Sequence, residues 1–166
     1  MLNKMSRGFT LIEVLVATFI ITVGIGAAII LVNQTTAFTQ VTSSRLAASY
    51  LAQEGLEIVK NIRDTNLLKI HKGVGGVSWD DGLTGCMAGC EGDYTSTTLS
   101  SYADRKLKIA GGFYKYSASG AETSFKRKIT ITPDTDILKV QVLVSWQERG
   151  RSHQVIAQEN LYQWMQ

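Results

Sequence analysis

Three residues near the amino terminus, Gly8, Phe9 and Glu13, have types and spacing that could do chemistry together. Glu13 is the one charged residue in an apolar run over residues 9–32. An ionisable group in such a run costs on the order of 2–3 kcal/mol on insertion scales, so it normally has a partner. The run contains no basic side chain. A cut between Gly8 and Phe9 would supply the missing cation, because it creates a new α-amino group.

A second pair with possible chemistry is Cys86 and Cys90, which enclose three residues. Outside the cytoplasm such a pair is expected to form a disulfide. Because the closed loop is small, the bond would pin a local turn and contribute little to holding the domain together. A zinc site would need more ligands, and the only histidines are His71 and His153; no metal site is predicted.

Other possible sites are weaker. Gly73, Gly75 and Gly76 lack the Lys-Ser/Thr pair of a phosphate loop, which favours simple turns. Four acids in the middle of the chain have no EF-hand spacing, so we interpret them as solvated turn residues, with calcium binding as the lesser alternative: Asp80, Asp81, Glu91 and Asp93. No nucleophile-elbow, zinc or carboxylate-pair spacing is present, so neither an enzyme nor a cofactor is predicted.

Basic residues in the second half of the chain could form a patch beside Tyr114 and Tyr116, as a DNA-capturing surface would require. They are Arg105, Lys106, Lys108, Lys126, Lys128, Arg149 and Arg151. Scattered solvated charges are the favoured interpretation. The chain has 17 basic and 14 acidic residues and a net charge of +3, which does not indicate a generic nucleic-acid binder.

The element that must position Glu13 is a helix over residues 9–32. Its 24 residues would span roughly 36 Å at about 1.5 Å per residue, enough to cross a bilayer. A cleaved secretory signal has a shorter apolar core, of about 7–15 residues. Lys4 and Arg7 precede the run and the next charge after Glu13 is Arg45, which predicts a cytoplasmic leader with the bulk of the chain outside.

An amphipathic helix is predicted to continue the chain over residues 33–70. One apolar face holds Leu51, Gly55 and Ile62, together with Ile58 or Val59. Four charged residues can face water: Glu54, Glu57, Lys60 and Arg63. No proline interrupts residues 9–70, so a single helix of about 55–60 residues is expected, with Gly24 and Gly26 as its weakest points.

The remainder, residues 71–166, is expected to form a β-rich head. Residues 71–105 predict loops, and a hairpin or two short strands are predicted over residues 107–117. Strict alternation over residues 125–132 and 138–146 predicts two longer strands, and residues 154–164 a final one after a turn at 148–152. One apolar face of this antiparallel sheet should cover the stripe on residues 46–62.

The segment Arg-Gly-Phe-Thr-Leu-Ile-Glu-Val, residues 7–14, resembles the type IV prepilin signal. The resemblance implies that a membrane peptidase and methyltransferase removes a leader, residues 1–8, and N-methylates Phe9. It implies that Glu13 pairs with the Phe9 amine of a neighbouring subunit. It also implies the α+β pilin fold, with a long helix packed on a carboxy-terminal antiparallel sheet. The proline that pilins often have farther along this helix is absent.

Several segments resemble minor subunits more than major ones. Three segments are similar to the type IV pilus modification protein V group and to pseudopilin I of type II secretion. They are Glu-Val-Leu-Val-Ala at 13–17, the segment at 51–64, and Val-Ser-Trp-Gln-Glu-Arg-Gly at 144–150. The implied partners are other pilin or pseudopilin subunits, the inner-membrane assembly platform and the membrane itself. A minor pilin, a pseudopilin and a tip subunit that binds DNA or a surface remain three alternatives.

Overall fold

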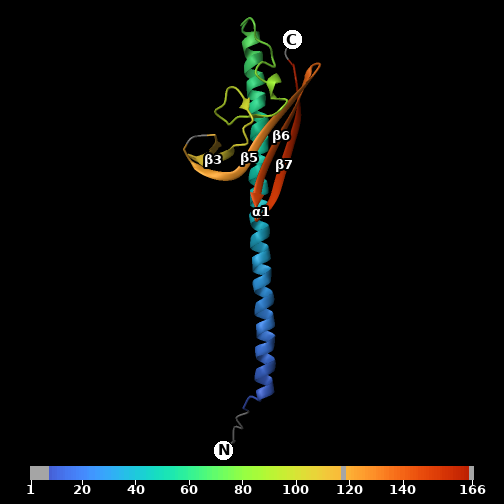
Figure 1. Ribbon diagram of the computed structural model, residues 1–166. Coiled ribbons are helices and arrows are strands. Elements are labelled where there is room, and N and C mark those ends of the chain that lie inside the picture. The colour runs from blue at the N-terminus through green and yellow to red at the C-terminus, as the bar shows by residue number, and fades with distance from the viewer. Residues whose placement is uncertain (1–7, 117–118, 165–166) are drawn as a thin grey trace, which may run out of the picture. The chain divides into compact units, whose positions relative to one another are not determined.

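A computed structural model describes residues 8–116 and 119–164 of the chain (Figure 1). It contains one long helix, α1 (Leu11–His71, 61 residues), a 3₁₀ turn, η1 (Thr84–Cys86), and seven strands. The strands are β1 (Cys90–Glu91), β2 (Ser100–Ser101), β3 (Lys106–Ala110), β4 (Phe113–Lys115), β5 (Ala121–Asp134), β6 (Ile137–Glu148) and β7 (Arg151–Tyr162). The predicted α+β class and the single long helix are confirmed.

The chain divides into two compact units that meet between Thr42 and Ser43. Residues 8–42 of the first unit are helical from Leu11 onward, and Gly24 and Gly26 do not interrupt the helix. None of its described residues is buried. Large apolar side chains are exposed all along it, and the described unit offers no surface of its own to cover them.

Threonine hydroxyls in this unit form hydrogen bonds within the helix. Thr22 and Thr35 donate hydroxyl hydrogen bonds of 2.7 and 2.9 Å to the carbonyls four residues earlier, and Thr36 and Thr39 do the same at 2.9 Å. Such internal bonding removes the cost of carrying a hydroxyl into an apolar environment. The threonines are therefore compatible with a helix surrounded by lipid or by other apolar helices.

The second unit is built around an antiparallel sheet. The longest strands, β5, β6 and β7, pair in sequence order, and β5 pairs on its other edge with β3 and β1. β6 and β7 are joined by a two-residue turn at Arg149-Gly150, whose φ angles of 51° and 75° lie in the left-handed region that tight hairpins require. The turn predicted over residues 148–152 is thus tighter than expected, and β7 is longer.

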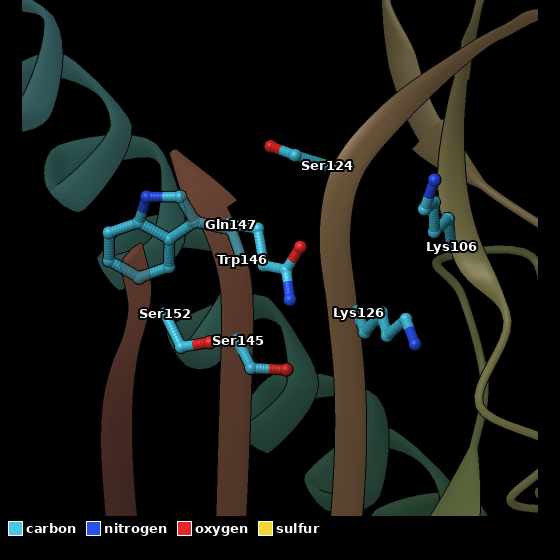
Figure 2. A pocket seen from close by; sticks show the side chains of 7 residues that line it. All are labelled: Lys106, Ser124, Lys126, Ser145, Trp146, Gln147 and Ser152. Atoms are coloured by element: carbon cyan, nitrogen blue, oxygen red, sulfur yellow. The ribbon is translucent and has the colours of Figure 1, made fainter. Parts of the chain in front are cut away.

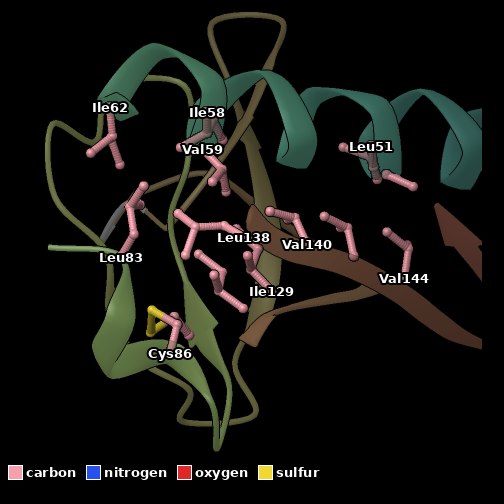
Figure 3. Close-up of a cluster of buried hydrophobic side chains, with 14 of the residues drawn as sticks. Leu51, Ile58, Val59, Ile62, Leu83, Cys86, Ile129, Leu138, Val140 and Val144 are labelled. Carbon is pink, nitrogen blue, oxygen red and sulfur yellow. A yellow bond between two sulfur atoms is a disulfide. The ribbon is translucent and has the colours of Figure 1, made fainter. Parts of the chain in front are cut away.

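The core lies between the sheet and the part of α1 that belongs to this unit (Figure 3). Leu51, Val59 and Ile62 on the helix meet alternate residues of β5 and β6, such as Ile129 and Val140. The predicted apolar stripe and both alternating strands are therefore confirmed.

Gly55 allows α1 to lie close against the sheet. A Cβ atom at this position would lie 2.7 Å from Cγ1 of Val142 and 3.2 Å from Cδ of Arg127. A glycine is therefore required at the point where the helix crosses the middle of β6.

The segment between helix and sheet is more ordered than the sequence predicts. Residues 71–105 were expected to be loops, yet they contain η1 and the two short strands β1 and β2. Each of these strands has two residues, so neither leaves an alternation pattern to detect. Their pairing depends on β5, through the Cys90–Ile129 register.

Candidate functional site

The predicted processing residues lie at the amino-terminal end of the described chain. Gly8 and Phe9 precede α1 in an irregular segment, and the Phe9 side chain is 82% exposed. No atom lies within 4 Å of a Cβ built on Gly8. The bond between the two residues is therefore accessible. Lys4, Arg7 and the rest of the leader up to residue 7 lie outside the described residues.

Glu13 occupies the first turn of α1, where its backbone is capped by Thr10. The Glu13 amide donates to the Thr10 hydroxyl (3.3 Å) and to the Thr10 carbonyl (3.1 Å). Thr-x-x-Glu at a helix start is the capping-box pattern, and an acid in the first turn also complements the helix dipole. The Glu13 side chain is exposed. Its carboxylate is thus available to another chain, and it also has a local role in its own helix.

The helix that follows Glu13 is long and apolar enough to cross a membrane. None of its most apolar stretch is buried. Exposed phenylalanine, isoleucine, leucine and valine side chains continue from Phe9 to Val32. An exposed apolar surface of this extent marks contact with a membrane or with partner subunits.

Cys86 and Cys90 form a disulfide, with their Cα atoms 5.2 Å apart. Both side chains are buried in the core cluster beside Leu83. The bond joins η1 to β1 and so fixes the start of the segment that carries Glu91 and Asp93. Its local character agrees with the prediction from the short spacing.

Two of the four acids that we interpreted as solvated turn residues are buried, and for them that interpretation is wrong. Glu91 is 1% exposed and is held by the Arg105 guanidinium, whose Nε lies 2.5 Å from Oε1. Asp93 is 7% exposed. No local pattern signals this burial, because it depends on distant residues such as Tyr116, whose amide donates to Asp93 Oδ2 at 2.8 Å.

The environment of Asp93 favours its charged form. Burial raises the pKa of this carboxyl, but hydrogen bonds outweigh burial and lower the pKa below its usual value. The donors are the Thr95 hydroxyl and the Tyr116 and Thr95 amides, with a weaker hydrogen bond from Ser96. Asp93 therefore stabilises the turn over residues 93–96 and its attachment to Tyr116, the residue after β4. Its four donors leave it little capacity to act as a ligand.

Arg127 is the most deeply buried charged residue of the described chain, at 0% exposure. Its Nη1 donates to the Leu51 carbonyl (3.0 Å) and lies 3.4 Å from Glu54 Oε2, and Nη2 donates to the Gly92 carbonyl (2.6 Å). The guanidinium thus ties α1, β5 and the segment after β1 together. Glu54, which was expected simply to face water, is half-buried against this cation.

Tyr116 completes the polar cluster. Its hydroxyl donates to the Arg127 carbonyl (3.2 Å), and the Arg105 guanidinium lies 4.8 Å from its ring centroid. Burial raises the pKa of Tyr116 to about 12. The phenol is therefore a neutral structural donor at physiological pH, with no role as an acid or base.

The predicted basic residues do not form a uniform patch of unpaired cations. Arg105, Lys106 and Lys126 are ion-paired with Glu91, Glu122 and Asp104, respectively. The Lys128 ammonium lies 5.5 Å from the ring centroid of Tyr102, and burial together with the Asp104 contact raises the pKa of that tyrosine. This arrangement gives no particular support to a DNA-binding surface. Among the described residues, no group of three or more His, Cys, Asp or Glu side chains is placed to hold a metal.

The chain matches one family model, described as the prokaryotic N-terminal methylation motif, over residues 3–29. The match includes Gly8, Phe9 and Glu13 and ends inside the first half of α1. A search of curated proteins and a search of solved structures return no match. The motif indicates a type IV pilin-like or pseudopilin protein, and with the apolar helix it fits anchoring in a membrane.

Proposed function

We propose that this chain is a minor pilin subunit of a type IV pilus that primes assembly or lies at the filament tip. The observation that carries the proposal is the methylation motif at the start of α1, where the large apolar side chains are exposed as far as Val32. In this proposal a prepilin peptidase cuts between Gly8 and Phe9 and the Phe9 amine is then methylated. The chain acts as a structural subunit and not as an enzyme.

Cleavage gives Glu13 its partner. The new amine at Phe9 is a cation, methylation keeps that charge, and the exposed Glu13 carboxylate of one subunit can reach the amine of a neighbour. A charge that enters an apolar environment unpaired is strongly penalised, so the pair fixes the axial register of two helices even where its net stabilisation is small. Glu13 is in this sense an assembly residue.

Processing also changes what holds the chain in the membrane. Before cleavage, Lys4 and Arg7 would keep the leader on the cytoplasmic side of the inner membrane and residues from about 33 onward outside it. The disulfide supports this orientation, since such bonds persist in oxidising compartments. Removal of the leader takes away two charges that oppose extraction of the helix, and the assembly platform can then transfer it to other pilin subunits.

A pseudopilin of a type II secretion system would use the same processing and the same helix. The genes beside this one distinguish the two roles. A pilus retraction motor and further minor pilins would support the pilus subunit, and an outer-membrane secretin with secretion components would support the pseudopilin.

Mass spectrometry of the protein purified from its native host tests the processing step. The expected amino terminus is N-methylated Phe9, and retention of residues 1–8 would contradict the proposal. A Gly8→Leu variant should keep its leader, because the peptidase needs a small residue there while the fold leaves space at this position. Gly26→Ala, also in open space within α1, is the matched control and should be processed normally.

A further inference from the structure

β5 and β6 form a fork on the outer face of the sheet, the face turned away from α1. The two strands pair from Asp134–Ile137 to Lys126–Ser145 and then separate. Beyond that point β5 pairs with β3, at Glu122 and Ala121, and β6 pairs only with β7. Among the described residues, the facing edges of residues 121–125 and 146–148 therefore have no strand partner. We call this opening the β5–β6 fork.

Aromatic rings close the fork on its core side. The rings of Phe125 and Trp146, both buried, are 5.7 Å apart, with Tyr114 beside Phe125 and His153 stacked on Trp146. The bulky rings of Phe125 and Trp146 thus lie on the core side of the two separating strands and fill the core there.

The fork contains a cavity of about 360 Å³ (Figure 2). The cavity backs onto Trp146 and is lined by side chains that can all donate hydrogen bonds: Lys106, Ser124, Lys126, Ser145, Gln147 and Ser152. Ser124 and Gln147 project into the space between the two strands. No carboxylate is among the lining residues, so the cavity is suited to a ligand rich in acceptors.

The charges around the fork favour an anion. Lys106 and Lys126 lie directly opposite each other on β3 and β5, and Lys108 lies opposite Lys115 on β3 and β4. Like charges at opposed positions destabilise a sheet. Glu122 contacts Lys106 at 2.8 Å and Asp104 contacts Lys126 at 2.5 Å, but each ammonium has three N–H groups and can also donate to a second carboxylate.

We propose that the β5–β6 fork binds an extended acidic peptide segment of another protein. The peptide backbone would pair with the free strand edges, as in strand addition to other sheets, and its carboxylates would contact Lys106 and Lys126. The free edges favour a peptide over a nucleic acid, which has no backbone complementary to a strand. This site depends on the sheet alone and would stand even if the chain were not a filament subunit.

The binding experiment uses the full chain in detergent and fluorescein-labelled, capped heptapeptides of alternating glutamate and valine. We expect saturable binding by anisotropy. A peptide with glutamine in place of glutamate, and one with N-methylated backbone amides but unchanged side chains, should each bind at least tenfold more weakly. Equal binding of the N-methylated peptide would overturn strand pairing, and equal binding of the glutamine peptide would overturn the role of charge.

Variants locate the site. The double substitution Lys106→Gln and Lys126→Gln should weaken binding at least tenfold, whereas Lys139→Gln, an ion-paired lysine elsewhere on the outer face, should not. Hydrogen exchange on the unmodified chain gives a second measurement that does not depend on variant folding. The peptide should protect amides within residues 122–124 and 146–148, whereas the Phe125 amide already donates to the Thr123 hydroxyl; protection elsewhere alone would overturn the site. Tighter, salt-sensitive binding of oligothymidylate at the fork would replace the peptide with a nucleic acid and contradict the proposal.

Discussion

The two halves of α1 have the same backbone conformation and opposite surroundings. From Leu11 to Thr42 the apolar side chains point outward and none is buried, and no charged residue follows Glu13. From Ser43 onward the apolar side chains gather on one face against the sheet, and several charged residues are paired, as Lys60 is with Glu57 and Glu159. The second half is stabilised within the chain, and the first requires a membrane or neighbouring subunits.

This comparison predicts that substitutions in the two halves will affect different measurements. Changes in the second half should lower the free energy of unfolding, which the buried Trp146 can report by fluorescence of the full chain in detergent. Changes in the first half should leave that free energy unchanged and affect assembly. Four substitutions, two in α1 and two elsewhere in the unit that holds its second half, test the difference, from the largest expected effect on unfolding to the smallest.

Arg127→Ala should have the largest effect, a loss of about 3–5 kcal/mol, because it leaves Glu54 and the Leu51 and Gly92 carbonyls without their buried cation. Chemical denaturation followed by tryptophan fluorescence measures it. Lys139→Ala, which breaks an exposed ion pair with Asp134, is the control and should change little. A loss below about 1 kcal/mol for Arg127→Ala would mean that the polar cluster does not hold helix and sheet together.

Gly55→Ala should cost about 1–3 kcal/mol by overpacking, although alanine has the better helix propensity, because its Cβ would lie 2.7 Å from Val142. Gly26→Ala makes the same change in the same helix with no neighbour within 4 Å. It should not lower the free energy of unfolding reported by Trp146. An equal change in the free energy of unfolding for Gly55→Ala and Gly26→Ala would contradict the difference between the two halves of α1.

Asp93 should give the second unit an acid-sensitive stability. Its pKa is lowered in the folded state, so its contribution is present above the unfolded pKa, near 3.8, and is lost as the pH falls through the folded pKa. Asp93→Asn should therefore lower stability at pH 7 by about 1–3 kcal/mol and flatten the loss of stability below pH 4. Denaturation series at several pH values measure both. If Asp93→Asn loses as much stability at low pH as the unchanged chain does, other groups cause the acid sensitivity.

Glu13→Gln should have the smallest effect on unfolding, close to zero, and a large effect on assembly. Glutamine keeps the capping-box pattern with Thr10 and removes only the charge. We expect normal leader removal but reduced incorporation into filaments isolated from the native host, measured by immunoblotting. Asp64→Asn, an exposed ion-paired acid in the second half of α1, is the control. Full incorporation of Glu13→Gln would refute the pairing with Phe9.

The polar cluster shows why part of the site could not be predicted. Arg127 lies on the buried face of β5 with Ile129, but its partners Leu51 and Gly92 are 76 and 35 residues away in the chain. Glu91 and Asp93 sit in a segment without periodicity, and acids in such segments are usually solvated. Only the approach of Arg105 and Tyr116 makes their burial possible.

The sequence by itself determined the features that depend on neighbours along the chain. These are the helix, from its apolar and amphipathic periodicity, the alternating strands β5 and β6, and the motif at Gly8, Phe9 and Glu13. Tertiary structure alone decided the burial of Glu91 and Asp93, the contacts of Arg127 and the fork between β5 and β6. The physical reason is that local propensity acts over a few residues, whereas burial and strand separation depend on which distant side chains pack together.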